Sequence, residues 1–138
     1  MTGWIGITLG DVTGIGPEVA LKAIAAETAS DQTRYLLIGD RDCVLHLNQK
    51  SGLNLPLKIF SNYGDSGRVF VTNPLAEPLL ENLPAGSPAA ARAAVAWLRA
   101  GAERCLRREF DALVTAPVIN LPARLNFSPD SPTPNAPP

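Results

Sequence analysis

The stretch that decides the fold of this chain is Gly10-Asp11-Val12-Thr13-Gly14-Ile15-Gly16-Pro17-Glu18. It follows an apolar run over residues 4–9 and precedes an amphipathic run over residues 19–26. Glycine permits backbone angles and close approaches that side chains block, and Pro17 suits the first turn of a helix. The pattern predicts a buried strand, a tight turn and a helix, which is the repeating unit of α/β proteins.

The same turn is a candidate anion site, because the first N–H groups of a helix lack partners and carry partial positive charge. Gly14 and Gly16 do not complete a dinucleotide fingerprint, since residues 17–19 contain no third glycine. The Gly-Lys-Ser/Thr of a phosphate loop is also missing. Two interpretations stay open here: an anion-binding turn, and a strand-to-helix connection that uses glycine for its geometry.

Composition restricts the class of protein. The 138 residues amount to about one domain, and 46% of them are hydrophobic, so a core can form. The net charge is −1 and basic residues are scattered, which argues against nucleic-acid binding. We see no basic leader region and no apolar run near the ~20 residues of a membrane span. Cys43 and Cys105 fit neither a metal motif nor a disulfide framework. We expect a cytoplasmic protein.

Strand and helix patterns alternate along the chain, which predicts a mostly parallel sheet covered by helices. Strands are expected at residues 4–9, 35–38, 57–60, 68–72 and 111–115. Helices are expected at residues 17–28, at 41–49 behind an Asp40 cap, and at 88–108 behind a Ser87 cap. The side chains expected to face inward are Val19, Ala23, Ile24, Val44, Leu45, Leu47, Ala90, Ala94, Trp97, Leu98, Gly101 and Cys105.

Thr115 ends the last strand pattern, and the carboxyl edge of an open α/β sheet is where ligands bind. Its hydroxyl could contact a ligand, or it could be a β-branched residue that closes a strand. Asp11 likewise could orient a substrate or stabilise the turn. His46 is the only histidine, so it cannot build a histidine metal site alone, and we expect it to be structural.

The character of the sequence changes after residue 119. The last part contains six prolines, shows no helical period and no strand alternation, and is otherwise rich in small polar residues. Such a segment buries too little apolar surface to offset its ordering entropy. We expect residues 1–119 to form the folded part and residues 120–138 to be disordered.

Two blocks of the sequence resemble the 4-hydroxythreonine-4-phosphate dehydrogenase family. Ile7-Thr8-Leu9-Gly10-Asp11-Val12-Thr13-Gly14-Ile15-Gly16-Pro17-Glu18 is similar to the N-terminal signature of that family, a strand followed by G-D/E-P-A-G-I-G-P-E. Phe110-Asp111-Ala112-Leu113-Val114-Thr115-Ala116-Pro117 resembles a later strand with its T-A/G-P turn. The resemblance covers residues 4–119, and the long alanine-rich helix pattern also stands in the expected place.

This resemblance implies a three-layer α/β fold, mostly parallel, like that of isocitrate and isopropylmalate dehydrogenases. It implies NAD(P)-dependent oxidation of the C3 hydroxyl of a phosphorylated hydroxy amino acid, followed by decarboxylation, in pyridoxal phosphate synthesis. It also implies a homodimer and a divalent metal that polarises the substrate oxygens.

The sequence departs from the family pattern in places that bear on activity. Val12 and Thr13 replace the usual Pro-Ala, and no lysine follows Pro117 in Val118-Ile119-Asn120-Leu121. The family's His/Gln-Thr-Glu turn, its metal-binding histidines and its phosphate-binding residues have no counterpart here. We expect an incomplete fold, truncated or frameshifted, that binds neither NAD(P) nor metal and does not turn over substrate.

The candidate substrate- or anion-binding residues are Asp11, Gly14, Gly16 and Thr115; no catalytic or metal-binding residue is assigned. Two alternatives remain open. One is a non-catalytic α/β module that binds an anion at the glycine turn. The other is part of a sister enzyme that acts on threonate or erythronate 4-phosphate.

Overall fold

The computed structural model describes residues 3–79 and 82–117 of the chain. Strands and helices alternate as the sequence pattern predicts. Their bounds are β1 Trp4–Thr8, α1 Gly16–Glu27, β2 Arg34–Ile38, α2 Arg41–Lys50, β3 Leu57–Ile59, β4 Val69–Thr72, α3 Pro88–Leu106 and β5 Ala112–Thr115. The disorder expected for residues 120–138 falls outside the described residues.

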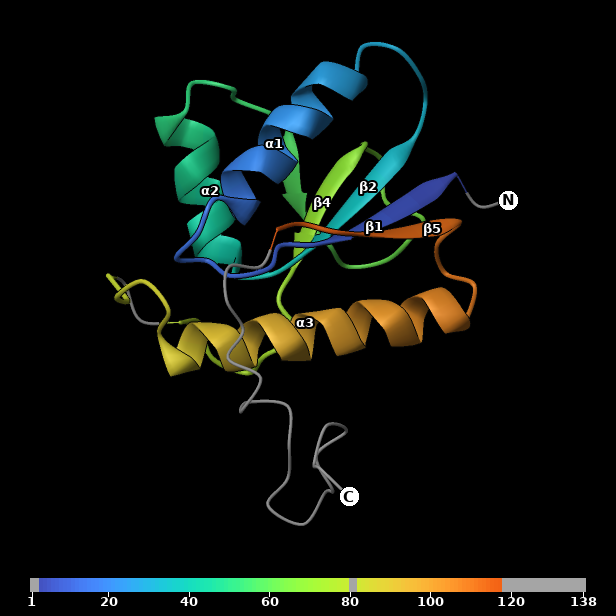
Figure 1. Cartoon of the computed structure of the whole chain (residues 1–138). Coiled ribbons are helices and arrows are strands. Elements are labelled where there is room, and N and C mark those ends of the chain that lie inside the picture. The colour runs from blue at the N-terminus through green and yellow to red at the C-terminus, as the bar shows by residue number, and fades with distance from the viewer. Residues whose placement is uncertain (1–2, 80–81, 118–138) are drawn as a thin grey trace, which may run out of the picture.

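The five strands form one sheet in the order β3-β4-β2-β1-β5, and each neighbouring pair is parallel. Helices α1 and α2 cover one face of this sheet and α3 covers the other (Figure 1). The three-layer, parallel α/β architecture is therefore confirmed. No helix in the described part of the chain is long and apolar enough to cross a membrane.

The central strand β2 is buried on both faces, as expected for a parallel sheet between two helical layers. Leu36, Leu37 and Ile38 have no exposed surface. Leu37 packs in the core beneath α1 and α2, whereas Leu36 and Ile38 pack beneath α3. This alternation follows from the two-residue period of a strand.

Helix α1 begins at Gly16 and Pro17 as predicted, but the predicted inward face is partly wrong. Ile24 is buried together with Ala20 and Leu21, whereas Val19 and Ala23 are exposed. The physical reason is the position of α1: one flank packs against α2, and among the described residues no element covers the other flank.

Helix α2 is capped by Asp40, as predicted: its Oδ1 accepts the Cys43 N–H at 3.0 Å. Its Oδ2 also accepts the N–H of Leu79 at 2.8 Å, so one buried carboxylate joins the helix to a distant segment. The predicted apolar face is correct for Val44, and Leu47 is half-buried, but Leu45 is exposed.

A polar side chain, Asn48, is buried on the inner face of α2, where Leu45 was expected. Its amide donates to the Leu55 carbonyl at 2.9 Å, and its Oδ1 accepts the Leu55 N–H at 2.8 Å. The Asn48 amide therefore bonds both the N–H and the carbonyl of Leu55, in the segment that follows the helix, which a leucine could not do.

Replacing Asp40 by alanine is expected to lower the free energy of unfolding by about 2 kcal/mol, because a helix cap and a second buried hydrogen bond are lost together. Urea unfolding followed by circular dichroism measures this. Replacing Asp42, an exposed acid in the first turn of the same helix, by alanine is the matched control. It should change the free energy of unfolding by less than about 0.5 kcal/mol. Equal effects of the two substitutions would contradict the double role of Asp40.

Helix α3 lays alanines, Trp97 and Gly101 on the sheet, and it ends at Leu106, two residues before the predicted end. Gly101 is needed for close packing, since a Cβ there would lie 2.8 Å from the Thr8 methyl carbon. Leu98 was expected inside but is 41% exposed. Ser87 stands at the N-cap position as predicted, yet its side chain makes no capping hydrogen bond.

An aromatic cluster packs in the core beneath α3. It consists of Trp4, Phe60, Tyr63, Phe70 and Phe110. The Tyr63 hydroxyl donates to Glu109 Oε1 at 2.7 Å, and burial, followed by this bond, raises the pKa of Tyr63 to about 12. Tyr63 belongs to the β3–β4 connection, so the cluster attaches that connection to the end of α3.

The β3–β4 connection is short for a parallel pair, which usually needs a crossover of about a dozen residues or more. It spans residues 60–68 and contains no helix. The Arg34 guanidinium holds it by donating to the carbonyls of Tyr63 at 2.9 Å, Gly67 at 3.0 Å and Asp65. A side chain of β2 thus replaces the packing that a crossover helix would supply.

Candidate functional site

The glycine turn lies at the carboxyl ends of β1 and β5, which are adjacent in the sheet. Backbone hydrogen bonds continue past both strands: the Leu9 N–H donates to the Ile38 carbonyl at 3.1 Å, and the Ala116 N–H to the Thr8 carbonyl at 2.8 Å. Helix α1 then begins at this edge. The carboxyl edge of an open parallel sheet is the usual place for a ligand.

Asp11 is buried and shapes the turn. Its Oδ1 accepts the N–H of Thr13 at 2.8 Å and the Thr13 hydroxyl at 2.6 Å, and its carbonyl accepts the N–H of Gly14 at 3.0 Å. One carboxylate oxygen is therefore engaged within the turn itself. This geometry supports the stabilising role that the sequence left open; a role in substrate orientation stays a prediction.

Gly10 and Gly16 have a packing reason to be glycine. Gly10 has a φ of +70°, and a Cβ on it would lie 2.6 Å from the Pro117 carbonyl oxygen. A Cβ on Gly16 would lie 2.5 Å from the Leu9 carbonyl oxygen and 2.8 Å from that of Pro117. The turn after β5 therefore lies directly against the turn after β1, and carbonyl oxygens occupy the space nearest to Gly16.

Thr115 lies on the other side of the sheet from α1. It is in register with Thr8, whose methyl group meets Gly101 of α3, so the Thr115 side chain lies on the α3 face. The structure thus brings the backbones of three predicted residues, Gly14, Gly16 and Asp11, into one turn. It does not direct the Thr115 hydroxyl toward that turn.

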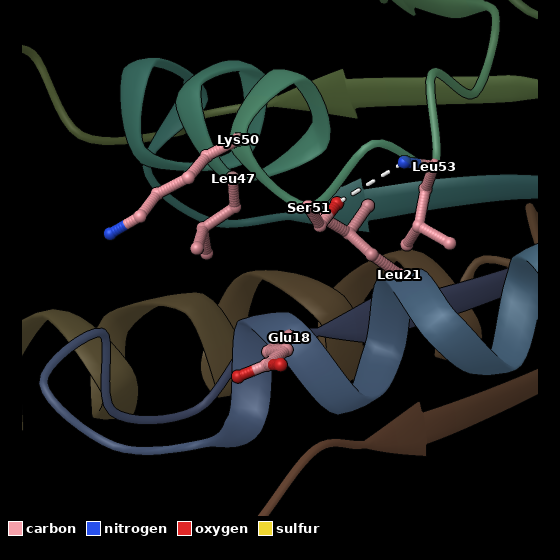
Figure 2. A pocket seen from close by; sticks show the side chains of 6 residues that line it. All are labelled: Glu18, Leu21, Leu47, Lys50, Ser51 and Leu53. Carbon is pink, nitrogen blue, oxygen red and sulfur yellow. Dashed lines mark hydrogen bonds between the residues drawn. The ribbon is translucent and has the colours of Figure 1, made fainter.

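A groove between α1 and α2 lies beside the glycine turn (Figure 2). Its volume is about 220 Å³, and Leu21, Leu47 and Leu53 form its apolar part. Glu18 and Lys50 stand at its rim. The hydroxyl of Ser51 donates to the Asn48 carbonyl at 3.3 Å and accepts the Leu53 N–H at 3.5 Å, so the backbone engages it.

Glu18 forms an ion pair with Lys22 one turn later on α1, with 2.8 Å between Oε1 and Nζ. The hydrogen bond from Lys22 lowers the pKa of the exposed Glu18 carboxyl. An ionised acid in the first turn also suits the helix dipole. The surroundings of Glu18 therefore favour a structural role.

A second cavity, about 240 Å³ in volume, lies at the carboxyl ends of β3 and β4 and was missed from the sequence. It is lined by Arg41, Asp42, Ile59, Val71, Thr72, Asn73, Leu75, Ala76 and Pro78. The sequence signal was available, because the strand pattern 68–72 and the helix start after Asp40 share this edge.

Asn73 holds the wall of this second cavity in place. Its Oδ1 accepts the Trp97 Nε1–H at 3.1 Å and the Leu75 N–H at 3.0 Å. The cavity also contains Arg41, which lies 3.8 Å from Asp42 in an exposed ion pair. Exposed pairs of this kind contribute little energy.

Metal binding finds no support in the part of the chain that the structure describes. No three His, Cys, Asp or Glu side chains gather there into a group that could hold an ion. His46 is exposed on α2. Burial, with a smaller contribution from Asp40, raises the pKa of the Cys43 thiol to about 11, so this thiol is not an activated nucleophile.

Comparisons with known proteins place these features in a family context. A 4-hydroxythreonine-4-phosphate dehydrogenase from Synechococcus sp. (strain JA-3-3Ab) is 32% identical over 120 residues, covering 83% of this chain and 32% of the relative. A D-threonate 4-phosphate dehydrogenase from Cupriavidus necator is 58% identical over 36 residues, covering 26% of this chain and 11% of the relative. No family model matches the chain.

The fold is also that of a solved relative. The crystal structure of a 4-hydroxythreonine-4-phosphate dehydrogenase from Burkholderia phymatum superposes with a TM-score of 0.68 at 28% identity, covering 84% of this chain and 36% of that one. The resemblance noted in the two sequence blocks is thereby confirmed over most of the chain. The chain spans about a third of the length of the relatives that match it over most of its own length.

Proposed function

Because this chain is a relative of the 4-hydroxythreonine-4-phosphate dehydrogenases and matches about a third of their length in the manner of an N-terminal fragment, we propose that it forms the scaffold part of such a dehydrogenase. The complete enzyme would oxidise and decarboxylate a phosphorylated hydroxy amino acid in pyridoxal phosphate synthesis. The observation that carries this proposal is similarity in sequence and fold over more than four fifths of the chain.

The residues of this chain supply position rather than chemistry in the proposed enzyme. A nicotinamide cofactor, NAD or NADP, would accept the hydride. No three His, Cys, Asp or Glu side chains of the described residues gather into a group that could hold a metal ion. We propose that the groups that bind cofactor and metal lie outside the described residues, and that this chain alone is inactive.

Asp11, Gly14, Gly16 and Thr115 remain our proposed contact residues for a substrate or anion. Their place at the carboxyl edge of β1 and β5 supports this, and for Asp11, Gly14 and Gly16 so does the adjacent α1 N-terminus. Titration of the chain with inorganic phosphate, followed by amide NMR, tests the proposal. Shifts confined to residues 11–18 and 115 are expected; their absence at millimolar phosphate would leave the turn with its packing role only.

The names of the relatives point to two substrates. D-threonate 4-phosphate is the specific alternative, because one relative acts on it according to its name. The test joins residues 3–117 to the remaining part of the Synechococcus relative and measures NAD reduction with each substrate. A higher kcat/KM for 4-phosphooxy-threonine supports the proposal. Preference for D-threonate 4-phosphate would favour the sister enzyme.

Two further expectations belong to the same proposal. A homodimer is expected of the complete enzyme, and sedimentation of the joined protein measures it. A cytoplasmic setting is supported by the two cysteines, Cys43 and Cys105, which are both free thiols.

A further inference from the structure

The cavity at the carboxyl ends of β3 and β4 lies where the connections of the sheet change sides. β2 leads directly into α2, which covers one face of the sheet, whereas β4 leads into α3 on the other face (Figure 1). β2 and β4 are neighbours in the sheet. Neighbouring parallel strands whose connections diverge in this way leave a crevice at their carboxyl ends, and open α/β sheets bind ligands there. The cavity and the topology are independent observations that indicate one place.

Both walls of this cavity are fixed by buried side chains. The Asp40 carboxylate accepts the N–H groups of Cys43 and Leu79, so it joins the start of α2 to the segment after β4. Asn73 accepts the Trp97 Nε1–H and thereby attaches the same segment to α3. A cavity that is formed before a ligand arrives costs that ligand less ordering entropy.

The polar groups of the lining are available to a ligand. Arg41 has a side chain that is 49% exposed, and its Nε lies 3.8 Å from the Asp42 carboxylate, beyond hydrogen-bond distance. Within the described part of the chain, no hydrogen bond engages the Arg41 guanidinium or the Thr72 hydroxyl. A guanidinium offers paired N–H donors that match the two oxygens of a carboxylate.

The rest of the lining is apolar. Ile59 is in register with the buried Val71, so their side chains share one face of the sheet, yet Ile59 is 55% exposed. A ligand with an apolar chain would cover Ile59 and gain free energy from that burial. The volume, about 240 Å³, is below the ~300–1,000 Å³ of pockets for drug-sized molecules. The apolar part of the ligand therefore has only a few carbon atoms.

We propose that this cavity binds a small monocarboxylate, with its carboxylate on the Arg41 guanidinium and the Thr72 hydroxyl and its short apolar chain against Ile59. A single negative charge suits the site better than the roughly double charge of a phosphate monoester, because Asp42 stands beside Arg41. None of the lining residues belongs to the glycine turn, so this site stands independently of the proposed function.

The experiment titrates the full chain with butyrate and follows the amide NMR spectrum, with butyramide as an uncharged ligand of the same shape. Saturable shifts at residues 41, 42, 59 and 71–76 are expected at millimolar butyrate, and none with butyramide. Arg41→Gln should weaken butyrate binding by about tenfold or more, because a charge-assisted hydrogen bond is lost. Asp42→Asn should tighten it, because the nearby negative charge is removed.

Lys50→Gln is the matched control for the loss of a positive charge. Lys50 lies on the same helix but lines the groove between α1 and α2, so its replacement should leave butyrate affinity unchanged. Circular dichroism checks that each variant is folded; Arg41 is exposed, so its replacement should leave the fold intact.

Several results would overturn the proposal. Equal binding of butyramide, or equal weakening by Lys50→Gln and Arg41→Gln, would remove the specific role of Arg41. No saturable shift at millimolar butyrate would reject the site. Butyrate shifts confined to residues 11–18 would place the anion at the glycine turn instead. Because the cavity and the glycine turn are read from different amides and no turnover is measured, failure of this site leaves the proposed function untouched.

Discussion

Replacing Trp97 by alanine is expected to lower the free energy of unfolding by about 4 kcal/mol, a large share of the 5–15 kcal/mol typical of a small domain. Trp97 has no exposed surface and packs on Leu36, Ile38 and Phe70 of the sheet. The cavity left by the indole would add to the lost burial.

The indole of Trp97 also makes a hydrogen bond that alanine cannot replace. Its Nε1–H donates to Asn73 Oδ1, which holds the segment after β4 against α3. Leu98→Ala is the control on the same helix, because Leu98 is 41% exposed, and it should cost about 1 kcal/mol or less. Urea unfolding monitored by far-ultraviolet circular dichroism measures both variants. Equal losses would mean that α3 does not pack on the sheet as described.

The second large effect is expected at Gly10, where alanine should cost about 3 kcal/mol. Gly10 combines a left-handed φ of +70° with a Cβ position only 2.6 Å from the Pro117 carbonyl oxygen. Gly52 has nearly the same φ, +74°, but has nothing within 4 Å of its Cβ position. Gly52→Ala therefore carries only the backbone strain, about 1 kcal/mol.

The difference between the two glycine variants, about 2 kcal/mol, measures the close packing of the β5 turn on the β1 turn. Thermal or urea unfolding of both variants gives this difference. A Gly10→Ala variant as stable as Gly52→Ala would show that Pro117 can move away at no cost. The turn after β5 would then not be fixed against the glycine turn.

The fold could be predicted from the sequence to the extent that it depends on local pattern. Apolar runs separated by glycine turns and amphipathic stretches sufficed for the strands, the helices and the parallel sheet. The Asp40 cap was also predictable, because a helix start is encoded by its own residues. What depended on neighbours was not: Val19, Ala23, Leu45 and Leu98 are exposed because no described element lies over them.

The candidate site was less predictable for a physical reason. The sequence could place Asp11, Gly16 and Thr115 at strand ends, but it could not show on which face of the sheet each side chain lies. Register decides this, and it puts Thr115 on the α3 face. The glycines gave two interpretations because packing and ligand binding require the same absence of a side chain.

The cavity at the ends of β3 and β4 also escaped the sequence. Its lining comes from three separate segments within residues 41–78, which the sheet order brings together. Strand order, unlike strand position, depends on long-range pairing. The helix-free connection between β3 and β4 was unpredictable in the same way, since it relies on Arg34 of another strand.

The most direct test of the central claim is an assay of this chain alone. Purified protein is mixed with 4-phosphooxy-threonine, NAD and a divalent metal, and the absorbance of reduced cofactor is followed. We predict no turnover above the rate without protein, because the chain supplies a scaffold whose catalytic groups lie elsewhere. Sustained cofactor reduction, abolished when substrate is omitted, would contradict this account.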